Sequence, residues 1–195
     1  MYEFVRGPLV WLAFIVLIGG SLIKLIYMYR LADKEKSVFP TMSAKYGFRS
    51  LIRWAIPFGT RNERLHPYMT VISFVFHACL LLTPLFVMGH AVLWQESWGV
   101  SWWSLPPAVA DGMTLTVIVC FFFLFLRRLT SPEVRNVNKP KDYLLSLLVV
   151  APFVTGFIAH KQWLPAEPML VAHIVTGVLW LIAIPFTWLA HMLWF

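Results

Sequence analysis

The sequence predicts an all-α membrane protein in which five transmembrane helices form a bundle. Hydrophobic residues make up 59% of its 195 residues and charged residues only 13%, whereas a soluble domain is typically about 45–50% apolar and about 25% charged. Five separate apolar segments also approach the roughly 20 residues that a helix needs to cross a bilayer. This composition excludes a soluble globular enzyme, a disordered chain and a collagen-like repeat.

The apolar segments define the expected helices in order along the chain. We expect them at about 8–29, 68–94, 107–126, 143–159 and 169–195, within one membrane domain over residues 1–195. The fourth segment is the shortest. No cleavable leader is expected, because the first apolar run is too long for a signal-peptide core and no small-residue cleavage motif follows it.

The stretch 43–58, between the first two apolar segments, has a different pattern. It mixes the basic residues Arg49 and Arg53 with Phe48, Leu51 and Ile52. Such a segment is typical of a short helix lying on a membrane interface. It is equally typical of a docking surface for a protein partner, and the sequence leaves both open.

Basic residues lie mainly on one side of the predicted bundle. Two loops hold most of the 16 Lys and Arg residues: Arg30, Lys34, Lys36, Lys45, Arg49, Arg53, Arg61 and Arg64 after the first helix, and Arg127, Arg128, Arg135, Lys139 and Lys141 after the third. Because such residues collect in cytoplasmic loops, we expect a periplasmic N-terminus and a cytoplasmic C-terminus. The net charge of +7 therefore reflects topology rather than nucleic-acid binding.

Metal centres built from cysteines or carboxylates are excluded by residue types. Cys79 and Cys120 are the two cysteines of the chain, and both lie in apolar runs. Two thiolates are too few for a cysteine-only zinc or iron–sulfur site. The Glu-x-x-His pairs of di-metal carboxylate bundles are also absent from the five expected bundle helices.

Four of the six histidines lie within or at the ends of the second and fifth helices: His77, His90, His173 and His191. Ionisable side chains at membrane depth are costly and mark functional sites by default. A single such histidine is as readily a neutral packing residue bonded to a neighbouring helix. Four of them, two on each of two helices, favour a ligand role.

The spacing of these histidines suggests two bis-histidine haem sites. His173 and His191 are 18 residues apart, which is five helical turns, so they share a face about 27 Å apart along an ideal helix. His77 and His90 are about 20 Å apart but differ by about 140° on a straight helix, and Pro84 between them can re-aim the two halves. If the helices are antiparallel, His77 meets His191 near the inner face and His90 meets His173 near the outer face. His66 is the reserve ligand if His90 is not used.

Several motifs resemble one family of membrane cytochromes. They are residues 173–177 (HIVTG) with 184–187 (IPFT) and His191 in the fifth helix, residues 127–135 (RRLTSPEVR) in the third loop, the paired histidines of the second helix, Gly7-Pro8, and residues 151–156 (APFVTG). Together they resemble the cytochrome b subunits of the respiratory nitrate reductase gamma-subunit family. Within that family the chain is most similar to the membrane subunit of the high-molecular-weight cytochrome c complex of sulfate-reducing bacteria.

The resemblance implies a subunit of the bacterial inner membrane that holds two haem b groups. Its iron ligands would be His77, His90, His173 and His191, and Arg127 and Arg128 are candidates for pairing with haem propionates. Electrons would pass between a periplasmic multihaem cytochrome c or a menaquinol pool and cytoplasmic iron–sulfur subunits. A periplasm-facing iron–sulfur subunit and other membrane subunits are implied partners.

Other interpretations stay open at this stage. A haem-free structural anchor would use the histidines for packing, and a small transporter would show internal repeats and broken helices. Arg127 and Arg128 also fit ordinary cytoplasmic loop charge. If the chain itself oxidises quinol near the outer face, the nearest ionisable residues there are Glu96, Asp111 and Lys161. The electron donor, the acceptor and the direction of flow are not specified by the sequence.

The distribution of basic residues predicts the outcome of a topology experiment. A reporter fused after Phe195 should behave as cytoplasmic, because the last helix is expected to end on the side of the two basic loops. A fusion in the loop after Trp98 is the matched control and should behave as periplasmic. The opposite pattern would invert the topology and exchange the sides on which the redox partners are expected.

Overall fold

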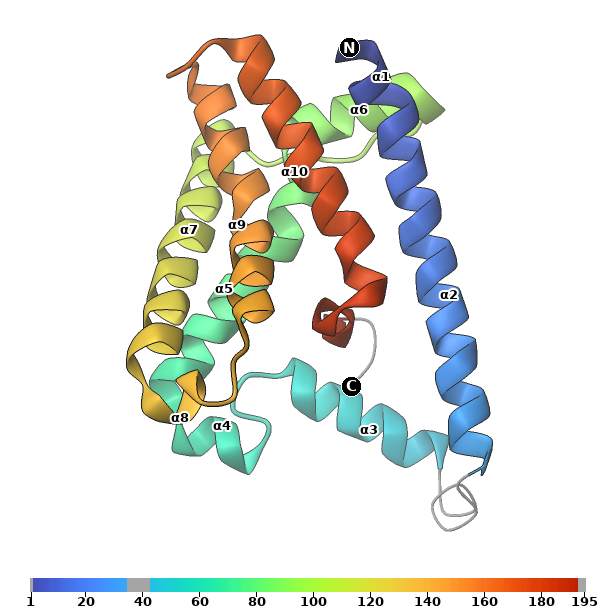
Figure 1. The fold of residues 1–195 in the computed structure, drawn as a ribbon, viewed down its shortest axis with the longest axis vertical. Helices are drawn as coiled ribbons and strands as arrows, with labels where there is room; N and C mark the ends of the chain where they lie inside the picture. The colour runs from blue at the N-terminus through green and yellow to red at the C-terminus, as the bar shows by residue number, and fades with distance from the viewer. Residues whose placement is uncertain (1, 35–42, 193–195) are drawn as a thin grey trace. The chain divides into compact units, whose positions relative to one another are not determined.

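The computed structural model describes residues 2–34 and 43–192, and this part of the chain is helical without any strand (Figure 1). Its elements are α1 (Tyr2–Phe4), the π-helical turn η1 (Val5–Leu9), α2 (Val10–Lys34), α3 (Ala44–Ala55), α4 (Arg61–Leu65), α5 (Pro67–Phe86), α6 (Met88–Trp98), α7 (Pro107–Thr130), α8 (Pro132–Arg135), α9 (Pro140–Lys161), α10 (Ala166–Phe186) and the 3-10 helix η3 (Trp188–Met192).

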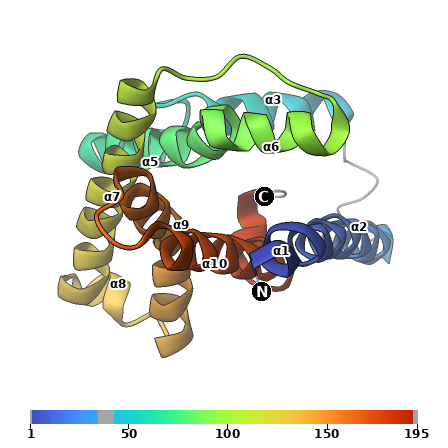
Figure 2. The same ribbon diagram turned by 90° about the horizontal axis from the view of Figure 1, so that it is seen from above.

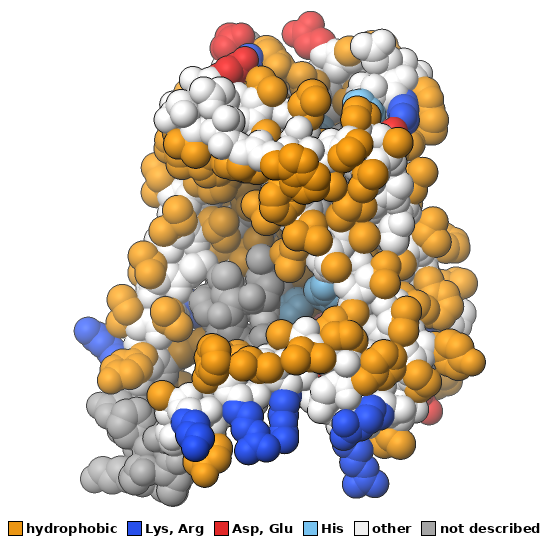
Figure 3. All heavy atoms as spheres, turned by 180° about the vertical axis from the view of Figure 1, so that it is seen from behind, with side chains coloured by type: hydrophobic (Ala, Val, Ile, Leu, Met, Phe, Trp, Pro, Cys, Tyr) orange, Lys and Arg blue, Asp and Glu red, His pale blue; other side chains and the backbone are white. Residues whose placement is uncertain are grey.

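Five helices are long and apolar enough to cross a membrane, which confirms the expected number. They are Tyr2–Leu31, Pro67–Phe86, Pro107–Thr130, Pro140–Lys161 and Ala166–Phe186. Their outer faces carry large apolar side chains that are open to the surroundings, such as Ile23 at 71% and Phe122 at 66% exposure, and hydrophobic side chains dominate the face in Figure 3. So much exposed apolar surface fits lipid rather than water. The chain is a multi-pass membrane protein.

Two of the expected helices end earlier than their apolar segments do. The second segment breaks at Val87, whose backbone is extended, and continues as the separate helix α6. In Figure 1, α6 turns away from the direction of α5. In the fifth segment, helix α10 ends at Phe186, and Thr187, whose backbone is extended, connects it to η3. Residues 193–195 of the expected fifth helix lie outside the described residues.

A proline near the C-terminal end of each helix favours an end there. Pro84 lies in the last turn of α5, and Pro185 is the residue before the end of α10. A proline in a helix removes one backbone hydrogen bond and clashes with the preceding turn. Hydropathy continues through both sites, so the apolar pattern alone does not reveal the breaks.

The chain divides into two compact units, residues 1–55 with 158–195 and residues 56–157. In the first unit, α10 packs along α2 and η1, as Figures 1 and 2 show. Gly20 of α2 marks the closest approach. A Cβ atom there would lie 2.9 Å from Cβ and 3.0 Å from Cγ of Pro185, so only glycine fits without movement of α10.

In the second unit, α5 packs along α7, and α8 joins α7 to α9. Val117 of α7 is fully buried, and Phe76 and Leu80 of α5 are buried on the same unit. The turn from α7 to α9 is braced by Arg128, whose guanidinium donates to Ser146 Oγ at 2.9 Å. The hydroxyl of Tyr143 donates to the Arg128 carbonyl at 3.2 Å.

The contact at Gly20 predicts a specific cost for adding one methyl group. Gly20→Ala should lower the stability of the purified protein by about 1–3 kcal/mol, because the rigid Pro185 ring cannot move aside. Gly19→Ala is the matched control, since nothing lies within 4 Å of a Cβ there; it should be neutral or stabilising by about 0.5–1 kcal/mol. Thermal unfolding in detergent measures both. Equal effects would show that α2 and α10 do not approach at Gly20.

Candidate functional site

His77 lies in the middle of α5 and bonds back to its own helix. Its Nδ1 lies 2.7 Å from the backbone oxygen of Ser73, one turn earlier. A carbonyl oxygen only accepts hydrogen bonds, so Nδ1 carries the proton and donates it. In that tautomer the lone pair is on Nε2. Iron-ligating histidines are commonly held this way, with the other ring nitrogen donating to a carbonyl.

His90 is held in the same tautomer by a different route. It lies on α6, beyond the break at Val87, and its half-buried ring turns back toward α5. Its Nδ1 lies 2.7 Å from the backbone oxygen of Pro84 and therefore donates to it. The lone pair of His90 is on Nε2 as well.

Two groups from the loop after α6 complete the end of α5. Trp102 donates its indole N–H to the Leu85 oxygen at 2.7 Å, and the Leu105 amide donates to the Phe86 oxygen at 2.8 Å. The last carbonyls of a helix have no partner within the helix. Together with the His90 ring, which donates to the Pro84 oxygen, these two groups give the carbonyls of Pro84, Leu85 and Phe86 a hydrogen-bond donor each. The sequence analysis did not identify Trp102 or Leu105 as partners of α5. The combination of Pro84 and Gly89 in an apolar run was the available signal for a break.

The break brings His90 over the same face of α5 as His77. The two accepting carbonyls belong to Ser73 and Pro84, which are 11 residues apart. Eleven residues make about three helical turns, so the two carbonyls differ by about 20° in direction and lie about 16 Å apart along the axis. The mismatch of about 140° expected for one continuous helix is therefore removed. The structure has a break at Val87, three residues after Pro84, and the sequence offered a change of direction at this proline as one way to re-aim the two halves.

The first unit holds the other two histidines. His173 is half-buried on α10, and His191 lies in η3 after the extended Thr187. The Nδ1 of His191 lies 2.9 Å from the Trp188 oxygen, and its ring stacks on the Trp188 indole with centroids 5.9 Å apart. The 18-residue spacing of His173 and His191 therefore does not lie on one continuous α-helix. The expectation of one shared α-helical face fails at this break.

The four histidines thus form one pair in each unit, His77 with His90 and His173 with His191. The pairing expected from the sequence joins residues of different units, so it stays a prediction. One expected depth differs from the structure. His77 is ten residues into α5, about 15 Å from its beginning and close to its midpoint, rather than near one end.

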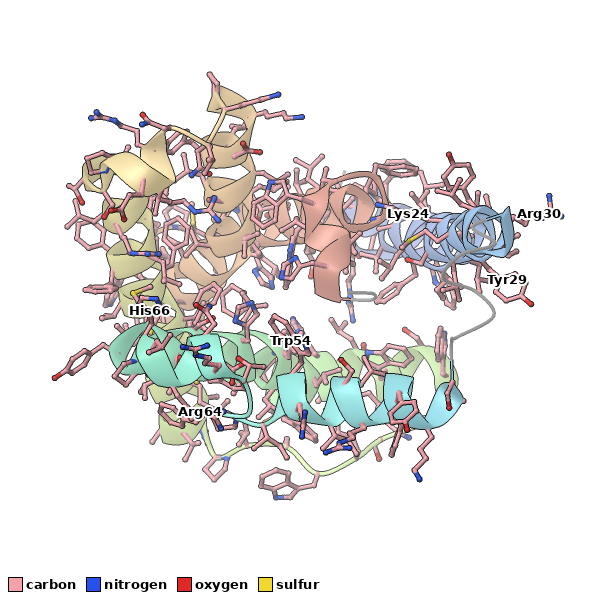
Figure 4. The ribbon with its side chains drawn as sticks, turned by 90° about the horizontal axis from the view of Figure 1, so that it is seen from below. Lys24, Tyr29, Arg30, Trp54, Arg64 and His66 are labelled. Atoms are coloured by element: carbon pink, nitrogen blue, oxygen red, sulfur yellow. The ribbon has the colours of Figure 1, made fainter. Side chains whose placement is uncertain are left out.

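His66, the reserve ligand, lies outside the membrane span. It is the exposed residue between α4 and α5, and Figure 4 shows it beside Arg64 of α4. Thr60 and Glu63 form a reciprocal cap at the start of α4. The Thr70 hydroxyl donates to the backbone oxygens of Glu63 and His66. These bonds stabilise the junction between α4 and α5, and the side chain of His66 is exposed there.

Arg127 and Arg128 lie together in the last turn of α7 but differ in their surroundings. Arg127 is exposed, whereas Arg128 is half-buried against Ser146 of α9. Among residues 2–34 and 43–192, three or more His, Cys, Asp or Glu side chains do not gather at a protein-only metal site. A haem iron needs just two axial imidazoles. The tautomers of His77, His90 and His191 fit that ligand chemistry.

Fold and site define a multi-pass helical membrane protein in which backbone carbonyls hold the rings of His77, His90 and His191. The chain is similar to a protein of Nitratidesulfovibrio vulgaris (strain Hildenborough) named simply "Protein", with 36% identity over 200 residues that cover 100% of this chain and 88% of the relative. It belongs to the same family as that protein. The chain matches no protein-family model and no solved structure.

The capping of α5 predicts that Trp102 supports the position of His90. Trp102→Phe removes the indole N–H and should destabilise the protein by about 1 kcal/mol, the usual net worth of one hydrogen bond. Amide hydrogen exchange around residues 85–91 should rise in parallel. Trp103→Phe is the matched control, because Phe retains an aromatic ring against Phe86. If amide hydrogen exchange stays unchanged in the Trp102 variant, the indole does not contribute to capping α5.

Proposed function

We propose that this chain is the dihaem cytochrome b subunit of a membrane-bound redox complex. The observation that carries the proposal is the Nδ1-to-carbonyl bond of His77 and of His90 over one face of α5. It selects the tautomer of an iron ligand for His77 on α5 and for His90 on α6. The expected counterparts on the other unit are His173 and His191.

The residues of the chain account for binding and orientation of the two groups. Backbone carbonyls of Ser73, Pro84 and Trp188 fix the rings of His77, His90 and His191. The apolar interior of a membrane would exclude water from the haems, and such surroundings tune the potential of a haem. When bound, haem b supplies a one-electron redox centre. Arg127 is the more available arginine for a haem propionate, because Arg128 already braces α9.

The proposed place of the subunit is the bacterial inner membrane, between redox partners on its two sides. A periplasmic multihaem cytochrome c or menaquinol lies on one side, and cytoplasmic iron–sulfur subunits lie on the other. A periplasm-facing iron–sulfur subunit and further membrane subunits complete the assembly. Menaquinone is the quinone candidate. Redox titration of the haems with and without a menaquinol analogue distinguishes a quinone-linked subunit from one served by a cytochrome alone.

A haem-free membrane anchor is the alternative function. The bond of His90 to Pro84 favours it, because His90 also caps the end of α5 and so has a structural role without any cofactor. The two functions differ in a direct observation. The anchor shows no haem absorbance after purification from cells supplied with haem, whereas the cytochrome does.

The four-histidine assignment predicts two low-spin haem b groups per chain, since each iron would have two imidazole ligands. His77→Ala, His90→Ala, His173→Ala and His191→Ala should each reduce the haem content from two groups to one. The pyridine haemochrome assay gives the content, and low-temperature EPR gives the spin state. His160→Ala, at the exposed end of α9, is the control and should retain both groups.

The same variants test how the ligands pair. His77→Ala and His191→Ala should remove one haem, and His90→Ala and His173→Ala the other. If His77→Ala and His173→Ala remove the same haem, the pairing is wrong and the mid-helix position of His77 explains the result. If His66→Ala loses a haem while His90→Ala keeps both, the ligand assignment on the second span is wrong.

A further inference from the structure

We propose that α3 is an in-plane helix that lies on the surface of the bilayer and binds anionic phospholipid headgroups. The proposal concerns a helix that carries none of the four histidines and is independent of the haem assignment. It selects one of the two roles that the sequence left open for this segment. Three features of α3 carry it: its two faces, its exposure and its direction.

The two faces of α3 separate apolar from basic residues. On an ideal helix, Phe48, Leu51 and Ile52 fall within an arc of about 100°. Lys45, Arg49 and Arg53 follow one another at every fourth position and occupy a neighbouring arc of similar width. A helix of this kind, with one apolar face and one strongly basic face, is typical of membrane interfaces.

The apolar face of α3 is open in the part of the chain that the structure describes. None of the residues of α3 is buried. Phe48 is 67% exposed, Leu51 52% and Ile52 43%. Twelve residues make a helix of about 18 Å, too short to cross the hydrocarbon core of about 30 Å. An apolar face of this length therefore needs an outside surface rather than a transmembrane position.

The connection to α2 keeps α3 close to the membrane. Ten Cα steps separate Lys34, at the end of α2, from Ala44, so the two residues lie at most about 35 Å apart. α3 runs roughly across the direction of α2 in the same unit (Figures 1 and 4), and Figure 4 shows Trp54 on α3 and Arg30 near the end of α2. Because α2 crosses the membrane, a helix across its direction lies along the membrane plane.

The direction of the side chains favours lipid over a protein partner. In Figure 3 the Lys and Arg side chains over α3 project downward, at the lower end of the molecule. Hydrophobic side chains lie directly above them. A water-soluble partner approaches from the basic side and would leave the apolar face uncovered. A bilayer surface covers the apolar face and places the three basic residues at headgroup level.

Charge identifies the class of lipid. Lys45, Arg49 and Arg53 lie on α3, and Arg61 and Arg64 follow on α4, while the acidic residue of that stretch is Glu63. Basic residues next to a membrane-spanning helix are attracted to anionic lipid headgroups. We therefore expect the surface of phosphatidylglycerol or a lipid of similar charge to hold α3 more firmly than phosphatidylcholine does.

Spin labelling of the full chain in nanodiscs tests this position directly. In a background of Cys79→Ala and Cys120→Ala, a label is placed at Leu51→Cys on the apolar face. The matched control is Ser50→Cys, which lies about 100° away on an ideal helix and keeps every charge. The Leu51 label should be accessible to oxygen, which enters lipid, and the Ser50 label to a water-soluble nickel reagent.

Lipid composition provides the second arm of the experiment. In phosphatidylglycerol nanodiscs the Leu51 label should report more of the docked state than in phosphatidylcholine. Each of Lys45→Gln, Arg49→Gln and Arg53→Gln should lower the ratio of docked to undocked helix about five-fold, the factor that corresponds to one basic residue at an anionic surface. Circular dichroism confirms that the variants keep their helical content.

Each other outcome overturns the proposal. A Leu51 label open to water in both lipids means that α3 does not bind the bilayer. A Leu51 label shielded from both reagents means that protein covers the face, and dipolar broadening between labels identifies that protein as a second copy of this chain. Equal docking in both lipids, unaffected by the three substitutions, removes the role of anionic headgroups.

Discussion

The absence of water inside a bilayer is the constraint on which the rest of this structure depends. Each backbone N–H and C=O at membrane depth needs a partner from the protein itself, so a helix can stop there only where other groups take over its last carbonyls. At the end of α5 those groups are the ring of His90, the indole of Trp102 and the amide of Leu105. The break at Val87 is stable because these three donors arrive together.

The same bonds link local structure to the proposed chemistry. A histidine whose Nδ1 donates to a carbonyl presents Nε2 as the basic nitrogen, which is the form that binds iron. At His77 the donor-acceptor pair lies within one helical turn, whereas at His90 it requires the chain to turn back across the break. The proline that disrupts α5 therefore also creates the acceptor for His90. The structural role of that ring is compatible with its proposed ligand role, because the two roles use different ring nitrogens.

A similar arrangement ends α10. Pro185 precedes the extended Thr187, the Thr187 hydroxyl donates to the Ala183 oxygen at 2.8 Å, and His191 follows in η3 with its Nδ1 on the Trp188 oxygen. At the same place, Gly20 of α2 lets the Pro185 ring approach the helix backbone. The ring of Pro185 thus serves both to end α10 and to set its distance from α2. Fold and candidate site meet at the same few residues.

The sequence by itself determined the five spans, the segregation of Lys and Arg into two loops and the two histidines near each of two helices. These follow from hydropathy and charge, which are local properties that add along the chain. The helix breaks at Val87 and Thr187, the tautomer of His90 and the contact at Gly20 were decided by tertiary structure. Leu85 finds Trp102 and Gly20 finds Pro185 only after folding, because the partners are far apart in sequence. No local pattern records whether such a partner will be present.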